Sequence, residues 1–367
     1  MSDFSAADRA HMARALVLAA KGLYTTTPNP RVGCVIVGDA GVIGEGFHVR
    51  TGEPHAEANA LADVLRRGGD AQGATLYVTL EPCNHHGRTP PCVDAILAAG
   101  VSCVVAAMAD PNPAAAHGAR RLRAAGIRVD FGLLENEARE LNIGFVSRMT
   151  RNLPWVRLKV AASADGRTAL ANGKSQWITG PEARADGHAW RARACAVLTG
   201  IGTIAQDDPR LTVRAVATSR QPLRVIIDPR GETPGDARVF ATGPVLLVTG
   251  GARNPAWPSD VETLALPDAR GRVDLPGLMR SLAGRGINEL HVEAGARLNG
   301  ALLAGGHVDE LLLYVAPSAL GDPARGMFEL DPPLTSLTAR VPLAWHTIDR
   351  VGADLRLIAR VVRQGEA

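Results

Sequence analysis

Two short segments in the first half of the chain place metal-binding side chains at defined spacings. The segment EPCNHHGRTPPC, residues 81–92, holds Cys83 and Cys92 with eight residues between them, and the segment HAE begins at His55. One imidazole and two thiolates form a ligand set that zinc prefers, and a zinc ion with only three protein ligands keeps its fourth position for water. The two segments therefore predict a catalytic zinc site with His55, Cys83 and Cys92 as its ligands.

Glu57, two residues after His55, is the candidate proton carrier of this site. Zinc lowers the pKa of its bound water to about 7, which supplies hydroxide at neutral pH. A carboxylate beside that water can move its proton to the substrate and the leaving amine without binding the metal. The order H-x-E, then P-C and a second cysteine, is typical of zinc deaminases that act on nucleobases, although those enzymes separate the cysteines by two residues.

Secondary-structure patterns position these side chains at one edge of a sheet. A helical pattern begins at His55, Cys83 follows the apolar strand pattern at 74–80, and Cys92 begins the next helical pattern. Strand ends and helix starts meet at one edge of an open α/β sheet, where the active sites of such folds lie. Each motif alone is a weak signal, but their order and placement favour a deaminase over unrelated thiols.

Further histidines and cysteines leave alternatives open. His85 and His86 are potential ligands, and either would complete the zinc shell and make the site structural. We assign both histidines, with Arg88, to the substrate side or the loop. Apolar strand patterns hold the three other cysteines, which are expected to be small buried side chains: Cys34, Cys103 and Cys195.

The length of 367 residues and the apolar content of 46% favour two domains with separate cores. After a hairpin pattern at 32–48, strand and helix patterns alternate, which predicts an α/β sandwich with a mostly parallel sheet. The pattern weakens at 142–154, and a second alternation follows it. We therefore expect a domain of residues 1–150 and a domain of residues 151–367.

Charge and composition exclude several classes of partner. Residues 1–150 contain 14 Lys+Arg and 15 Asp+Glu, and the remainder contains 26 and 22, so neither half has the basic excess that nucleic-acid binding needs. No run of 18 apolar residues occurs, and the N-terminal segment contains acids, so we expect no membrane span and no signal peptide. Five cysteines make a poor disulfide framework. These features predict a cytoplasmic protein without a nucleic-acid or membrane partner.

Several longer stretches carry a family resemblance. The first half resembles the deaminase domain of the bifunctional riboflavin biosynthesis proteins, diaminohydroxyphosphoribosylaminopyrimidine deaminase with 5-amino-6-(5-phosphoribosylamino)uracil reductase, and the long HGRTPP loop between the cysteines is a feature of that family. The matching stretches are PNPRVGCVIV (28–37), GEGFH (44–48), GEPHAEANAL (52–61), EPCNHHGRTPPC (81–92) and AMADPNP (107–113). The second half resembles the family's reductase domain in LKVAASADGRTA (158–169), SQWITG (175–180), GIGTIAQDDPRLTVR (200–214) and VEAGARLNGALL (292–303).

The resemblance implies a fold class and two reactions. It implies a cytidine-deaminase-like αβα sandwich followed by a dihydrofolate-reductase-like α/β domain, which would be a zinc-dependent pyrimidine deaminase and an NADPH-dependent reductase. The substrate would be a pyrimidine ribosyl phosphate, which is deaminated by zinc hydroxide and then reduced at its ribosyl group to a ribityl chain. Because reductases of this fold often pair sheets across a dimer interface, a homo-oligomer is expected.

The resemblance also assigns residues by position. His55, Cys83 and Cys92 match the family's zinc ligands, and Glu57 matches its proton carrier. The substrate contacts that it implies in the reductase half are Ser175, Arg191, Leu211, Arg214 and Glu293. The NADPH contacts that it implies are Ala161, Trp177, Thr203, Asp207, Gly295, Ala296, Arg297, Leu298, Asn299, Gly300 and Ala301. An arginine can contact a phosphate through two N–H groups, which suits Arg191 and Arg214 to a phosphorylated substrate.

Three features compete with this interpretation or depart from it. The stretch GIGTIA at 200–205, with Asp228 after a later strand, fits a weak dinucleotide-binding fingerprint of the Rossmann type. After DPNP, His117 and Ala119 flank Gly118 where many members have a valine and two glycines, so the pocket can differ there. A nucleic-acid deaminase of the transfer-RNA type with a C-terminal RNA-binding module and a zinc-stabilised scaffold without activity are the alternative functions.

Overall fold

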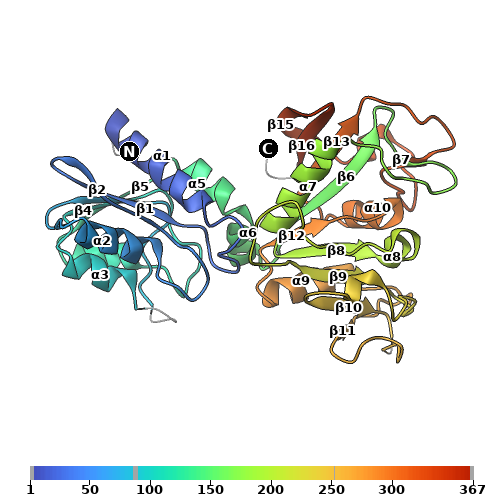
Figure 1. The fold of residues 1–367 in the computed structure, drawn as a ribbon, viewed down its shortest axis with the longest axis horizontal. Coiled ribbons are helices and arrows are strands. Elements are labelled where there is room, and N and C mark those ends of the chain that lie inside the picture. The colour runs from blue at the N-terminus through green and yellow to red at the C-terminus, as the bar shows by residue number, and fades with distance from the viewer. Residues whose placement is uncertain (1–3, 86–89, 252, 364–367) are drawn as a thin grey trace. The chain divides into compact units, whose positions relative to one another are not determined.

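The chain forms two compact units in a computed structural model, residues 1–152 and residues 153–367 (Figure 1). The structure describes residues 4–85, 90–251 and 253–363. Each unit has its own central sheet and its own hydrophobic core. Within the described ranges, none of the helices has the length and the apolar run that crossing a bilayer requires.

The first unit is built on a five-stranded sheet in the order β2-β1-β3-β4-β5. Its strands are β1 (Gly33–Gly38), β2 (Gly41–Phe47), β3 (Thr75–Val78), β4 (Cys103–Ala106) and β5 (Arg128–Phe131). β1 is antiparallel to β2 and β3, whereas β3, β4 and β5 are parallel. The hairpin followed by parallel strands agrees with the sequence pattern. Because β2 and β3 run in the same direction, both strands end at the same edge of the sheet.

Helices cover both faces of this sheet, with α1 and α5 on one side and α2 and α3 on the other (Figure 1). The helices are α1 (Ala6–Ala20), α2 (Ala56–Arg66), α3 (Cys92–Ala98), α4 (Gly118–Ala124), α5 (Glu135–Leu141) and α6 (Ile143–Arg151). α1 begins with a capping box, in which the Ser5 hydroxyl accepts from the backbone of Asp8 and the Asp8 carboxylate accepts from the backbone of Ser5.

The segment in which the sequence pattern weakened is helical in the structure. Asn142 lies between the short helices α5 and α6 and is buried. Its side chain accepts a hydrogen bond from the backbone N–H of Arg31 at 2.8 Å and donates one to the carbonyl of Arg31 at 2.9 Å. A contact between residues 111 positions apart therefore helps to hold the two helices, and a local sequence pattern cannot reveal it.

The second unit contains a nine-stranded sheet in the order β11-β10-β9-β8-β12-β6-β13-β16-β15, and the short strands β7 and β14 pair separately. Its strands are β6 (Trp155–Ser163), β7 (Arg167–Ala169), β8 (Ala196–Gly200), β9 (Leu223–Ile227), β10 (Val245–Thr249), β11 (Glu262–Ala265), β12 (Glu289–Val292), β13 (Glu310–Ala316), β14 (Arg325–Gly326), β15 (Leu343–Val351) and β16 (Asp354–Val361). Its helices are α7 (Pro181–Arg193), α8 (Ile201–Asp207), α9 (Leu275–Gly284) and α10 (Ala296–Ala304).

The two faces of the large sheet have different chemistry. On one face, alternate residues of the central strands pack with α9 and α10 in an apolar core that includes Leu158, Leu198 and Leu290. On the other face, β6, β12 and β13 present Arg157, His291 and other polar groups beneath α7, whereas β8, β9 and β10 carry a separate apolar cluster that includes Val197. Period-two alternation along each strand separates the two faces.

Arg157 is the centre of a buried ion cluster under α7. Its guanidinium donates to Glu310 at 2.5 Å and to Glu289 at 3.0 Å, and all three side chains are almost completely shielded from solvent. The same guanidinium stacks 4.3 Å from the centre of the Trp190 ring, and Arg193 of α7 donates to Glu289 at 2.7 Å. The cluster therefore ties α7 to the sheet through charge pairs, in addition to the small apolar cluster in which Ala183 of α7 packs with Leu312 and Tyr314.

Replacing Arg157 tests this attachment of α7. In the variant Arg157→Met, two buried carboxylates lose a charged partner, so we expect a loss of about 3 to 5 kcal/mol in the free energy of unfolding. Urea denaturation followed by Trp fluorescence measures this loss. As a control, Arg230→Ala removes an exposed ion pair with Glu232 and should change stability by about 0.5 kcal/mol or less. A loss below about 1 kcal/mol for the Met variant would contradict the role of the cluster.

Candidate active site

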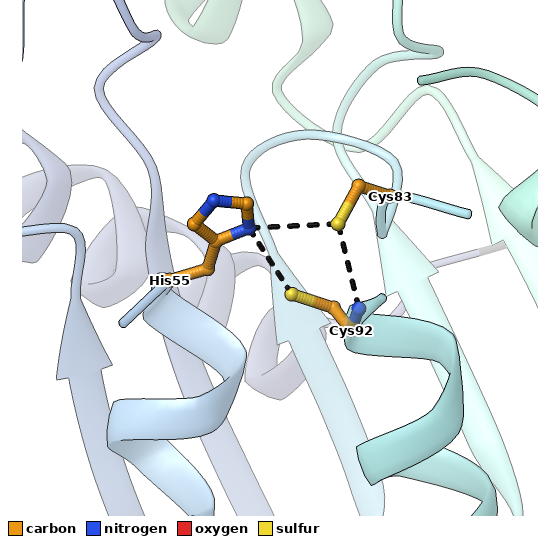
Figure 2. A group of neighbouring side chains, drawn as sticks. All are labelled: His55, Cys83 and Cys92. Atoms are coloured by element: carbon orange, nitrogen blue, oxygen red, sulfur yellow. Dashed lines mark hydrogen bonds between the residues drawn. The ribbon is translucent and has the colours of Figure 1, made fainter. Parts of the chain in front are cut away.

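His55, Cys83 and Cys92 converge at one point of the first unit (Figure 2). Their ligand atoms all lie within 4.8 Å of one another, and the Nδ1 atom of His55 is 3.5 Å from the Cys83 Sγ atom and 3.3 Å from the Cys92 Sγ atom. A tetrahedral zinc with usual bond lengths separates its nitrogen and sulfur ligands by roughly 3.5 Å. The donor set and its spacing fit a zinc ion.

Each ligand occupies an element boundary. His55 is the N-cap residue of α2, Cys83 follows β3, and Cys92 is the first residue of α3. The backbone N–H of Cys92 donates to the Cys83 sulfur at 3.4 Å, so the start of α3 supports a thiolate at that position (Figure 2). The contact with Cys92 lowers the pKa of Cys83 to about 4, and the same contact raises the pKa of Cys92.

Glu57 is buried beside the three ligands. It lies in the first turn of α2 and lines the same pocket as His55 and Cys83. Burial raises the pKa of the Glu57 carboxyl to about 7, with a further contribution from the negative charge of Cys83. A carboxyl group that is poised between its two protonation states near neutral pH suits a proton carrier.

A pocket of about 550 Å³ opens over these residues. Asn29 and His48 form part of its wall, and the Nδ2 atom of Asn29 is 3.1 Å from the Nε2 atom of His48. The rings of His48 and His55 meet edge to face, with their centres 5.3 Å apart. Sequence reasoning missed both wall residues as site residues, although Asn29 stands in the PNP stretch that it quoted.

Glu81 organises the opposite wall of the pocket. Its buried carboxylate accepts hydrogen bonds from the backbone N–H groups of Asp110 at 3.2 Å and Ala119 at 2.9 Å. A side chain at Gly118 would come within 1.8 Å of the Pro82 carbonyl oxygen, so only glycine allows the start of α4 to approach the ligand loop this closely. Sequence reasoning overlooked Glu81 as well, although this residue directly precedes Pro82.

The region that departs from the family pattern contains an unusual backbone conformation. His117 adopts a left-handed backbone conformation with φ 75°, immediately before α4. His85 lines the pocket, and its Nδ1 atom is buried with no hydrogen-bond partner among the residues that the structure describes. His86 and Arg88 lie outside the described residues. Cys34 and Cys195 are buried as expected, whereas Cys103, the first residue of β4, is only partly buried and lines a second pocket.

The structure brings four of the five predicted substrate contacts of the second unit into one neighbourhood. Arg191 of α7 forms a two-pronged ion pair with Glu293, which follows β12, and its third nitrogen donates to the carbonyl of Thr212 at 3.3 Å. Arg214 donates to the hydroxyl of Thr212 at 3.1 Å. Leu211, adjacent to Thr212, is buried, so it packs in the core. Ser175 is partly buried in the loop before α7.

Two further side chains belong to this charged neighbourhood. Burial, together with the charges of Arg191 and Arg214, lowers the pKa of His188 to about 4. Burial also lowers the pKa of Lys159 on β6, and the negative charge of the nearby Glu293 partly offsets this decrease. Although burial alone would raise it, Arg191 holds the pKa of the Glu293 carboxyl well below its usual range. Lys159 lies in the LKVAAS stretch of the family resemblance, but its proximity to Glu293 and Arg191 was not evident from the sequence.

The predicted NADPH contacts lie mainly on two neighbouring strand ends. β8 leads into α8, which contains Thr203 and Asp207, and β12 leads through Gly295 into α10. β8 and β12 are parallel neighbours, so both helices start at the same edge of the sheet. A side chain at Gly200 would lie 3.2 Å from Leu298, which shows how closely the two turns approach.

The predicted cofactor turn at α10 and two residues distant from it in the chain, Ala161 and Trp177, complete the predicted NADPH contacts. The predicted turn spans the N-cap Gly295 and the first six residues of α10, Ala296, Arg297, Leu298, Asn299, Gly300 and Ala301. Ala161 is partly buried on β6. Trp177 is 69% exposed, and the Arg184 guanidinium stacks 4.6 Å from its ring centre. An exposed aromatic ring of this kind is not explained by core packing.

The glycine-rich stretch 200–205 does not belong to a Rossmann unit of the usual order. β6 precedes β8 in the chain and lies on the far side of β12, next to β13. The sheet also ends in the antiparallel strands β16 and β15. The fingerprint match therefore reflects a strand, turn and helix in a different topology.

Comparison with protein families identifies both units. The family model of the RibD C-terminal domain matches residues 154–354, and the model of the cytidine and deoxycytidylate deaminase zinc-binding region matches residues 5–108. Riboflavin biosynthesis protein RibD of Escherichia coli K12 is 48% identical over 364 residues, which cover 95% of this chain and 98% of the relative. The RibD protein of Haemophilus influenzae is 47% identical over 97% of this chain and 98% of the relative.

Solved structures agree with these matches. RibD of Acinetobacter baumannii superimposes with a TM-score of 0.89 at 43% identity, covering 97% of this chain and 99% of that chain. The diaminohydroxyphosphoribosylaminopyrimidine deaminase/5-amino-6-(5-phosphoribosylamino)uracil reductase of Thermotoga maritima gives 0.88 at 35% identity, with the same coverage. The expected fold class, a cytidine-deaminase-like sandwich followed by a dihydrofolate-reductase-like domain, is confirmed.

Metal analysis tests the ligand set. We expect Cys92→Ala to lower bound zinc from about one ion per chain to about a tenth or less after dialysis against a chelator, because two ligands hold zinc poorly. Elemental analysis of the purified protein measures this. His85→Ala should retain its zinc, as should Cys103→Ser, which changes a thiol remote from the site. If His85→Ala lost its zinc while Cys92→Ala kept it, the ligand assignment would be wrong.

Proposed function

The chain belongs to the RibD family of bifunctional riboflavin biosynthesis enzymes, and from this premise we propose which of its residues perform each of the two reactions. The protein is a zinc-dependent deaminase of 2,5-diamino-6-(5-phosphoribosylamino)pyrimidin-4-one and an NADPH-dependent reductase of the deaminated product. We assign the deaminase to residues 1–150 and the reductase to residues 151–367. The convergence of His55, Cys83 and Cys92 beside the buried Glu57 is the observation that carries the assignment.

In the deaminase, the proposed zinc ligands are His55, Cys83 and Cys92. Zinc, when bound there, supplies a hydroxide at neutral pH that can attack the amine-bearing carbon of the pyrimidine. Glu57 takes up the proton of that water and delivers it to the departing amine, which leaves as ammonia. Its raised pKa allows the carboxyl to accept and release a proton at neutral pH. Asn29 and His48 lie where they can orient the pyrimidine ring.

In the reductase, the proposed cofactor region is the edge of the sheet where β8 and β12 end. The N-terminus of α10 offers backbone N–H groups to the cofactor phosphates, and Thr203 and Asp207 line the neighbouring turn. Trp177 and Ala161 complete the proposed contacts. NADPH, when bound there, supplies the hydride that reduces the ribosyl group to the ribityl chain.

The proposed substrate residues of the reductase act as one charged group. Arg191 and Glu293 pair with each other, so the arginine fork that suits a phosphate is already engaged by a carboxylate. We therefore propose that Glu293 and Arg191 orient substrate hydroxyl and carbonyl groups, and that Arg214 provides the phosphate contact. Ser175 lies in the loop before α7 as a further polar contact, and Leu211 shapes the wall from the core.

We also propose that the enzyme is a cytoplasmic homo-oligomer. β15 is an edge strand of the large sheet, and it exposes Trp345 at 60% and Ile348 at 59%. Exposed apolar side chains on an edge strand favour association, because an unpaired strand can extend its sheet across an interface. The nucleic-acid alternative is not favoured, since residues 154–354 match a reductase domain rather than an RNA-binding module.

Glu57→Gln separates the two activities. We expect ammonia release from the diaminopyrimidinone ribosyl phosphate to fall by about 10³-fold or more, because the amide cannot transfer protons. Zinc content and NADPH-dependent reduction of the deaminated product should remain near wild-type values. Products identified by mass, with and without NADPH, measure both steps. A wild-type protein that releases no ammonia, or never consumes NADPH after deamination, contradicts the proposed function.

Trp345→Lys tests the oligomer. A charge on the exposed edge strand should weaken association, so we expect the mass in solution to shift toward that of the single chain. Light scattering after size exclusion measures this mass. Arg350→Lys changes an exposed residue of the same strand without changing its charge and serves as the control. An unchanged mass for the Trp345 variant would exclude β15 as the contact.

A further inference from the structure

Trp177 projects from the loop that connects β7 with α7. Its side chain is 69% exposed, although an indole ring usually buries most of its surface. A ring that rotates freely loses this freedom when a ligand binds to it, and the loss weakens binding. The residues that hold the ring in place therefore bear on the affinity of this part of the reductase.

The loop is anchored on both sides of the ring. Before it, the side-chain amide of Gln206 on α8 donates to the carbonyl of Gly173. After it, the backbone N–H of Gly180 donates to the carboxylate of Asp354 at 2.7 Å. Between these anchors, none of the side chains of residues 175–178 forms a hydrogen bond within the described part of the chain. The anchors fix the ends of the stretch and leave the indole ring itself to another contact.

Arg184 of α7 provides that contact. The centre of its guanidinium lies 4.6 Å from the centre of the Trp177 ring, within the range of about 6 Å over which a cation is attracted to an aromatic face. The Nη1 atom of the same guanidinium donates to the carbonyl of Thr179 at 2.8 Å, and Thr179 is buried. One planar group therefore holds both the ring and the backbone two residues after it.

No carboxylate competes for this guanidinium. Among the described residues, Arg184 has no ion-pair partner, whereas Arg191 on the same helix is paired with Glu293. Arg184 lies in the first part of α7, next to Ala183, which is buried against the sheet. The side chain thus starts from a fixed helix and ends on the loop, so the helix determines where the ring lies.

The guanidinium stands against one face of the indole ring. Because 69% of the side chain remains exposed beside it, the opposite face is available to a ligand. A flat group can stack on such a face, and both the nicotinamide and the adenine of NADPH are flat. A ring that is already oriented loses less freedom when the cofactor binds.

We propose that Arg184 is a positioning residue for the cofactor, which holds the Trp177 ring in the orientation that receives NADPH and thereby increases the affinity of the reductase for it. This inference rests on the proposed cofactor contact of Trp177. Arg184 lies outside the stretches that carry the family resemblance, so only its placement in the folded unit identifies it.

Steady-state reduction of the deaminated product by the full-length enzyme tests this role. For Arg184→Ala, we expect the KM for NADPH to rise about 3- to 10-fold while kcat stays within about twofold, because a stacked cation and a hydrogen bond are lost away from the reacting atoms. Ammonia release in the deaminase step should not change. Arg184→Lys should fall between the wild type and the Ala variant, because lysine keeps the charge but lacks the planar fork.

Tryptophan fluorescence reports the orientation of the ring directly. NADPH absorbs the light that an indole emits, so the bound cofactor quenches a nearby tryptophan, and Trp177→Ala defines the share of the quenching that this ring contributes. We expect that share to fall in Arg184→Ala at saturating NADPH. Arg280→Ala is the matched control, since it removes an exposed guanidinium from α9 on the other face of the sheet and should behave as wild type. Thermal melting establishes that each variant is folded.

NADH separates positioning from a direct contact with phosphate. NADH has the same rings as NADPH but lacks the additional phosphate group on the adenosine ribose. If Arg184 positions the ring, Arg184→Ala weakens the binding of NADPH and NADH by the same factor. If the substitution weakens the binding of NADPH alone, Arg184 contacts that phosphate instead and the inference is wrong.

The outcomes distinguish this inference from the function on which it rests. If the wild-type enzyme never oxidises NADPH with the deaminated product, the proposed function fails and the inference fails with it. If the wild type reduces the product but Trp177→Ala binds NADPH equally well, both the proposed contact of Trp177 and the inference are wrong. If Trp177→Ala weakens binding and Arg184→Ala does not, the inference alone is wrong. An equal loss for both cofactors, with partial rescue by lysine, supports it.

Discussion

The convergence of one imidazole and two thiols constrains the whole first unit. Three ligand atoms must lie within 4.8 Å of one another, although His55 and Cys83 are 28 residues apart in the chain. The sheet brings them together because β2 and β3 run in the same direction, so both strands end at the same edge. The starts of α2 and α3 then fix the ligands. The close approach at Gly118 and the two backbone hydrogen bonds to Glu81 support the same edge from the opposite side.

In the second unit, apolar packing and buried ion pairs both hold helices against the sheet. One face of its sheet is a conventional apolar core, whereas the face under α7 is held by buried ion pairs around Arg157. Buried charges contribute little stability compared with apolar residues of similar size, but removing one partner is costly. The charged side chains around Arg157 are followed, toward the end of β12, by the ion pair of Arg191 and Glu293. The side chains that hold α7 against the sheet and those that we propose to contact substrate are therefore continuous along β12.

Sequence reasoning was most effective where chemistry is local. The H-x-E motif and the two prolyl-cysteine pairs identified a zinc site, and the alternating patterns identified the strands that flank it. It was less effective for helices α5 and α6, which are short and depend on Asn142 contacting Arg31 across 111 positions. It also missed Asn29, His48 and Glu81, because each acquires its role from a neighbour that is distant in sequence.

By itself, the sequence determined the family, the donor types for zinc and the order of the two domains, since these depend on residue identity and short spacing. Only the tertiary structure decided which side chains share a pocket. It showed that Arg191 is paired with Glu293, and it brought Asn29, His48 and Glu81 to the pocket that contains His55 and Cys83. The physical reason is that a spacing along the chain specifies contacts within one helix or strand. Contacts between elements follow from how the sheet packs them.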